Sequence, residues 1–155
     1  ITVHGHVNDS PCDITSGGVS GGNVDINYNE VSKHTITTTA SHEHQFTIHL
    51  ENCVLPTASV GTPKVSITFK STKTLADMNH TMDADHGVGV QITDNNTSTH
   101  NLVDLSGTKP IEFSFPAQSS TSLDLKFATQ LIQFNSQTID TGDFSATATY
   151  TLTYS

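Results

Sequence analysis

Histidine is the residue type in this chain with the widest chemical scope, because a neutral imidazole binds transition metals and titrates near neutral pH. The 155 residues include nine histidines, and two pairs are spaced i, i+2: His4 with His6, and His42 with His44. On a strand both members of such a pair face one side and could bind Zn²⁺ or Cu²⁺. Polar surface positions explain all four, so we expect no metal, with His42 and His44 as the alternative.

The acidic residues offer no better case for catalysis. Asp83 and Asp85 are close in sequence, but a catalytic pair needs two carboxylates in different environments that face a shared cleft. Residues 94–96 (Asp-Asn-Asn) do not have the spacing of an EF-hand loop, and a turn explains them. Ser, His and Asp are abundant, yet no Gly-x-Ser-x-Gly motif occurs. We predict no catalytic residue, no cofactor and no enzymatic activity.

Charge excludes two further classes of partner. The formal net charge is −9, with six lysines and no arginine, whereas nucleic-acid binding needs clustered basic residues. An anionic membrane surface is excluded for the same reason. No apolar run approaches the roughly 18 residues of a membrane span. No signal peptide is apparent, so an exported protein would be represented here by its mature form.

The elements that must position these residues are strands. Apolar residues make up 34% of the chain and alternate with Thr, Ser and Asn in short runs. Residues 75–86 are polar and irregular and are predicted to form a long loop, and residues 24–26 a short edge strand. The apolar residues change parity between Leu131 and Ile132, which predicts a bulge or a bend. The alternating runs, which predict one β-sandwich, are residues 1–7, 46–50, 65–69, 88–92, 111–115, 123–134 and 144–154.

The two cysteines, Cys12 and Cys53, leave two alternatives. Free thiols would need two separate roles without any recognisable motif. A disulfide needs only an oxidising compartment, which suits the Thr/Ser-rich and Lys-poor composition. The sequence therefore favours a disulfide, and closing this loop would stabilise the fold by about 4 kcal/mol.

The final strand has the clearest pattern in the chain. From Phe144 to Tyr154, apolar residues occupy every second position and Ser or Thr fill the others. The sequence stops one residue later, whereas chain ends are usually polar and frayed. We therefore expect another strand to pair with this one.

Three segments resemble the pilin subunits of bacterial chaperone–usher fimbriae. They are ITVHGHVNDSPC at the start, FTIHLENC at the second cysteine, and GDFSATATYTLTYS at the end, with a penultimate Tyr154. They occur in the family's order, and the resemblance spans the whole chain. The resemblance implies an all-β fold: an incomplete immunoglobulin-like sandwich that lacks its last strand and is completed by a donor strand from a neighbour.

The resemblance also assigns roles to residues. Residues 1–11 would be the donor-strand extension and residues 12–155 the pilin domain, with Cys12 and Cys53 bridged. The family's extension begins a few residues before the position of Ile1, so donation by this sequence would be shortened. Basic residues of the chaperone would anchor the carboxylate of Ser155. The donor residues would be Ile1, Val3, Gly5 and Val7, and the acceptor groove would be lined by Phe144, Ala146, Ala148, Tyr150, Leu152 and Tyr154.

These inferences predict a structural subunit of a surface fimbria that supports cell adhesion. Its partners would be a periplasmic chaperone, an outer-membrane usher and neighbouring subunits. It would reach the extracellular fimbria through the periplasm of a Gram-negative bacterium. Two alternatives stay open: an adhesive module that binds a glycan or a protein, and a His-rich periplasmic metal-binding protein.

Overall fold

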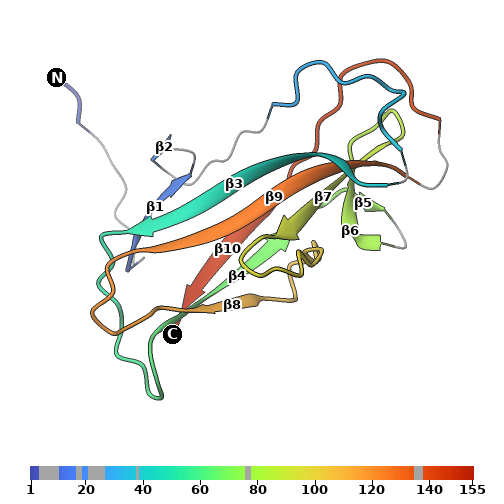
Figure 1. The fold of residues 1–155 in the computed structure, drawn as a ribbon. Coiled ribbons are helices and arrows are strands. Elements are labelled where there is room, and N and C mark those ends of the chain that lie inside the picture. The colour runs from blue at the N-terminus through green and yellow to red at the C-terminus, as the bar shows by residue number, and fades with distance from the viewer. Residues whose placement is uncertain (4–10, 17–18, 21–26, 38, 76–77, 135–137) are drawn as a thin grey trace.

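The computed structural model describes residues 1–3, 11–16, 19–20, 27–37, 39–75, 78–134 and 138–155. These residues contain ten strands, arranged as two sheets, and the described part has no helix (Figure 1). Accordingly, none of these residues form a helix of the length and apolarity needed to cross a bilayer. The all-β class predicted from alternation is confirmed.

The larger sheet has seven strands in the order β2-β1-β3-β9-β7-β6-β5, and the smaller has three in the order β10-β4-β8. Every strand pair is antiparallel. The larger sheet comprises β1 (Asp13–Ser16), β2 (Val19–Ser20), β3 (Ser41–Glu51), β5 (Thr74–Leu75), β6 (Met78–Asp83), β7 (Val88–Asp94) and β9 (Leu123–Gln133). The smaller comprises β4 (Lys64–Lys70), β8 (Ile111–Ser114) and β10 (Thr149–Tyr154).

The core lies between the two sheets and is built from alternating positions. On β4, Val65, Ile67 and Phe69 are buried while the residues between them are less so. Phe127 of β9 is fully buried, and the ring of Phe69 packs edge-on against it at 5.1 Å between centroids. This contact joins the middle of the small sheet to the middle of the large one, as expected for a sandwich core.

The parity change in β9 has another cause than the predicted bulge. β9 pairs with β7 in unbroken register from Gln133 to Phe127. Beyond Phe127 both faces of β9 are covered, because Ala128 and Thr129 are buried as well and the hydroxyl of Tyr28 lies 2.6 Å from that of Thr129. The irregularity lies instead in the partner strand β3, between Ser41 and His44.

The prediction of a long loop over residues 75–86 was wrong. Met78–Asp83 form β6, which pairs antiparallel with β5 at one edge of the large sheet, with Thr74 opposite Met82. Thr81 is fully buried, and its hydroxyl accepts a hydrogen bond of 3.0 Å from the Gln91 side chain on β7. Polar side chains that satisfy each other can occupy a buried strand, which hides the alternation in the sequence. The strand predicted at residues 24–26 lies outside the described residues.

Candidate strand-binding groove

β10 forms an edge of the small sheet. Its pairing with β4 runs from Thr149 opposite Lys70 to Tyr154 opposite Val65. Ser155 continues the ladder: its N–H donates to the carbonyl of Lys64 at 2.9 Å, and its carbonyl accepts from the N–H of Lys64 at 2.8 Å. No strand of the described residues pairs with the other side of β10. An edge of this kind offers backbone donors and acceptors to an added strand.

The side chains of β10 have two different environments. Tyr150, Leu152 and Tyr154 are half-buried and pack against the core, whereas the threonines between them are exposed. This matches the alternation read from the sequence. The inward-facing side chains are covered less completely than the corresponding residues of β4.

An open groove of about 880 Å³ runs beside β10. One wall consists of residues 150–154 of β10. The opposite wall comes from the residues around the first cysteine and from the segment after the second: Pro11, Ile14, Val54, Leu55 and Pro56. The groove thus lies between the edge strand of the small sheet and the chain around the two cysteines, and it is lined mainly by apolar side chains.

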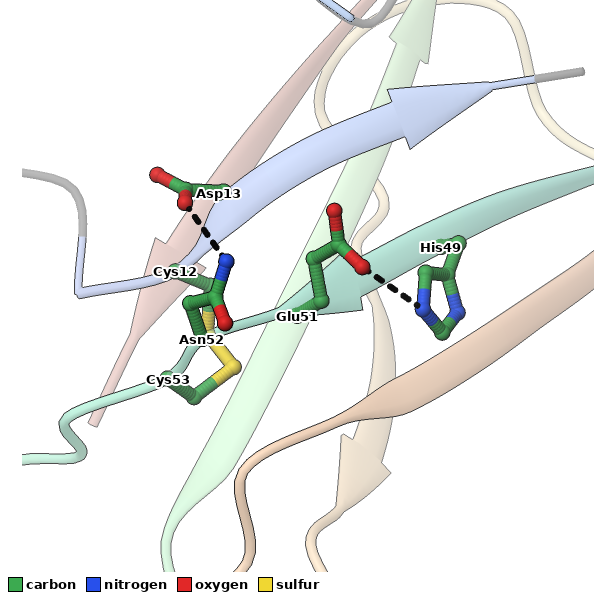
Figure 2. The surroundings of a disulfide bond; sticks show 6 residues. All are labelled: Cys12, Asp13, His49, Glu51, Asn52 and Cys53. Carbon is green, nitrogen blue, oxygen red and sulfur yellow. Dashed lines mark hydrogen bonds and ion pairs between the residues drawn. A yellow bond between two sulfur atoms is a disulfide. The ribbon is translucent and has the colours of Figure 1, made fainter. Parts of the chain in front are cut away.

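The opposite wall is fastened at the disulfide. Cys12 and Cys53 are bonded, which confirms the predicted bridge (Figure 2). The N–H of Val54 donates to the carbonyl of Pro11 at 2.8 Å, and the side chain of Asn52 donates to Asp13 at 3.0 Å. These contacts hold the beginning of β1 beside the end of β3, and with it the part of the wall formed by Pro11 and Val54.

The upstream part of the predicted groove is arranged differently. Phe144 and Ala148 are half-buried against the core, but Ala146 is exposed and the strand begins only at Thr149. The reason is the length of β4, which ends at Lys70, the partner of Thr149. Before that point the chain is held by a side chain, the hydroxyl of Ser71, which donates to the carbonyl of Thr147.

The predicted donor residues are only partly described. Ile1 is fully exposed and Val3 is 89% exposed, and the N-terminus lies away from both sheets (Figure 1). Gly5 and Val7 lie outside the described residues. Sequence reasoning missed the wall at residues 54–56, although a Val-Leu-Pro run directly after a bridged cysteine was its available signal.

The sequence profile of the fimbrial protein family matches residues 1–155. The chain belongs to this family. Its fold also matches solved structures at low sequence identity. One is a subunit from the structure of a chaperone–usher pilus that reveals the molecular basis of rod uncoiling: 19% identity, TM-score 0.79, covering 100% of this chain and 94% of that one.

Two other structures extend this likeness. The P pilus rod subunit PapA is 18% identical, with a TM-score of 0.75 over 94% of this chain and 100% of that one. The CupB6 tip adhesin from Pseudomonas aeruginosa is 18% identical, with a TM-score of 0.55 over 77% of this chain and 31% of that one. No curated protein matches at the sequence level. The fold is therefore the immunoglobulin-like pilin sandwich that lacks its last strand, and this fimbrial protein is a structural subunit of a bacterial surface pilus.

The histidine pairs are placed as follows in this pilin. His42 sits at the irregularity of β3 with a φ of 59°, and its Nε2 lies 3.1 Å from the hydroxyl of Thr35. The ring of His44 contacts that of Tyr28 at 4.3 Å between centroids. The described residues contain no group of three His, Cys, Asp or Glu side chains placed to hold a metal ion. His4 and His6 lie outside the described residues.

The acidic residues singled out in the sequence are engaged in turns of this pilin. Asp83 accepts a hydrogen bond from the N–H of Asp85, and Asp85 pairs with the Lys73 ammonium at 2.5 Å. The Lys73 hydrogen bond holds the pKa of Asp85 below its usual value. Asp94 accepts hydrogen bonds from the backbone and side chain of Asn96. Turn formation explains these residues.

His49 gives the pilin a pH-dependent contact on the outer face of the large sheet. Its Nδ1 bonds Asp124 on β9, and its Nε2 lies 3.5 Å from Glu51 (Figure 2). The hydrogen bond to Asp124, with the charges of both carboxylates, raises the pKa of His49 above its usual value. A raised folded-state pKa stabilises the fold fully below about pH 6.5, and that contribution is lost as pH rises through the folded pKa.

We expect His49→Gln to lower the free energy of unfolding more at pH 5.5 than at pH 8.5. Urea denaturation of both proteins at the two pH values measures this difference. The control is His34→Gln, because His34 is exposed and distant in sequence from this cluster. A loss that is the same at both pH values would contradict the assignment.

Proposed function

We propose that this pilin assembles by donor-strand exchange, with residues 1–11 of one copy occupying the groove of another. The observation that supports the proposal best is the position of β10 at the edge of the small sheet, beside an apolar groove. A strand added there would extend the small sheet by one strand and cover Tyr150, Leu152 and Tyr154. Chaperone–pilin donor-strand complementation is a known example of such β-augmentation.

The pattern of the extension suits this role. Ile1, Val3 and Val7 would face the core at every second position, and Gly5 would lie where no side chain fits. All strand pairs in the fold are antiparallel, so we place the donor antiparallel to β10. Its first residues then lie beside the end of β10, near Tyr154.

A free groove is an aggregation liability, so the subunit requires a cover before it is incorporated. In our proposal a periplasmic chaperone supplies that cover, with basic residues on the Ser155 carboxylate, and an outer-membrane usher exchanges it for the next subunit. The protein acts by assembly and catalyses no reaction. The pathway to the surface would run through the periplasm of a Gram-negative bacterium.

A synthetic peptide of residues 1–11 tests the exchange. We expect an excess of it to raise the free energy of unfolding of the full chain, by about 2.7 kcal/mol at a concentration of 100 Kd. The same peptide with Gly5→Phe should give almost no increase, because the bulky side chain would meet the core. Urea denaturation with each peptide, and with a scrambled peptide as the control, measures the effect.

Equal stabilisation by all three peptides would show non-specific binding and would count against the proposal. So would the absence of any stabilisation by the native peptide over a range that reaches millimolar concentration.

A further inference from the structure

The groove wall opposite β10 depends on a connection without secondary structure. The chain between β3 and β4 runs from Asn52 to Pro63 and contains no strand. Residues 54–56 of this connection, here called the shelf, line the groove. Leu55 is half-buried against the core, but Val54 is 83% exposed and Pro56 is also exposed. Burial alone therefore fixes only one of the three residues.

The backbone of the shelf is held by one side chain that is distant in the sequence. The amide nitrogen Nε2 of Gln118 donates to the carbonyl of Leu55 at 3.2 Å and to that of Pro56 at 3.1 Å. Two consecutive carbonyls are thus oriented by one amide group. The hydrogen bonds next to the disulfide reach as far as Val54, whose N–H donates to Pro11. The bonds from Gln118 hold the two residues that follow.

The position of Gln118 is itself fixed by the surrounding structure. It lies in a turn closed by two hydrogen bonds between Ala117 and Ser120, of 2.9 and 3.1 Å. Phe115, just before the turn, is 1% exposed, and its N–H donates to the carbonyl of Pro63. The turn is therefore anchored in the core and can position an exposed amide.

We propose that Gln118 is a positioning residue for donor-strand binding, because it holds the shelf against which the first apolar residue of the donor packs. The inference rests on the proposed exchange. In the antiparallel arrangement the donor begins beside Tyr154, at the end of the groove where the chain leaves β3 and enters β4. Ile1 of the incoming copy is the residue that the shelf would contact, whereas Val7 would lie farther along β10.

Gln118→Glu is the sharpest variant, because it keeps the shape of the side chain. The carboxylate has no N–H to donate, and its charge would face two carbonyl oxygens. We expect the peptide of residues 1–11 to dissociate about threefold to tenfold faster from this variant, as for the loss of hydrogen bonds of ordinary strength. Gln118→Ala should give a similar change without added charge.

The matched control is Gln45→Glu. Gln45 is exposed on β3, and its amide donates to Glu43 at 3.3 Å without lining the groove. Peptide dissociation from this variant should match that from the unmodified chain. Urea denaturation of each protein without peptide shows whether the fold itself has changed.

A double-mutant cycle separates positioning from a general loss of stability. Peptides with Ile1→Ala and with Val7→Ala are compared on the unmodified chain and on both Gln118 variants. If the shelf contacts Ile1, the Ile1→Ala penalty shrinks in the Gln118 variants, while the Val7→Ala penalty is unchanged. The inference would be overturned if the Ile1→Ala penalty were the same on the unmodified chain and on both Gln118 variants. It would also be overturned if the native peptide dissociated from both Gln118 variants at the unmodified rate. Failure of the exchange itself is distinguishable, because the native peptide would then not bind the unmodified chain.

Discussion

Leu152→Asp is expected to lower the affinity of the groove for the donor peptide by a factor of at least about 100. Leu152 lies in the middle of the exposed edge, half-buried, and opposite Ile67 of β4. In the free subunit the new carboxylate could still reach water through the open groove. A docked donor would remove that water, and burying an unpaired charge costs several kcal/mol.

The chain offers a control for the added charge. Val60→Asp makes the same kind of change at an 84% exposed residue that does not line the groove. Peptide affinity by fluorescence anisotropy should fall for Leu152→Asp and stay constant for Val60→Asp. Comparable affinities of the two variants would mean that the donor does not occupy the groove along β10.

Removing the disulfide between the buried residues Cys12 and Cys53 is expected to cause a large loss of stability. The bridge joins residues 41 positions apart, and the chain-entropy relation gives about 4 kcal/mol for a loop of that length. We therefore expect Cys12→Ala with Cys53→Ala to lower the free energy of unfolding by that amount. The loss should extend to the groove, because the bridge holds Pro11 and Val54 on its far wall.

Urea denaturation of the oxidised chain, of the reduced chain and of the double variant measures the contribution of the bridge. The reduced chain and the double variant should agree within about 1 kcal/mol, since both lack the constraint. A difference below about 1 kcal/mol between the oxidised chain and the double variant would contradict this account.

Alternation carried most of the information about the fold. The core positions of β4 and β10 follow from it, because each of these strands has one face toward the core and one toward water. Alternation did not predict the strands that lack a clear division into one buried and one solvent-exposed face. β9 is covered on both faces beyond Phe127, and β6 buries Thr81 against Gln91, so neither segment shows a period of two.

The candidate site was predictable in part for a similar reason. One wall of the groove is a regular strand, whose inward residues can be counted from the sequence. The other wall is a connection without regular structure, placed by a disulfide and by hydrogen bonds from Gln118, which is distant in sequence from Leu55. Nothing local in residues 54–56 specifies those contacts.

The position of β10 in the chain has a consequence for the rate of folding. Its first residue pairs with Lys70, 79 residues earlier, so the entropy cost of closing the loop between them precedes any stabilisation from the pairing. Strand pairs with shorter connections, such as β6 with β7, meet that cost more easily. β10 is therefore expected to dock late, as β9 is onto β3, after a period in which an edge of β4 and the apolar face of β10 are both open. A strand that binds during this period would shorten the lifetime of the intermediate most exposed to aggregation, in addition to stabilising the final fold.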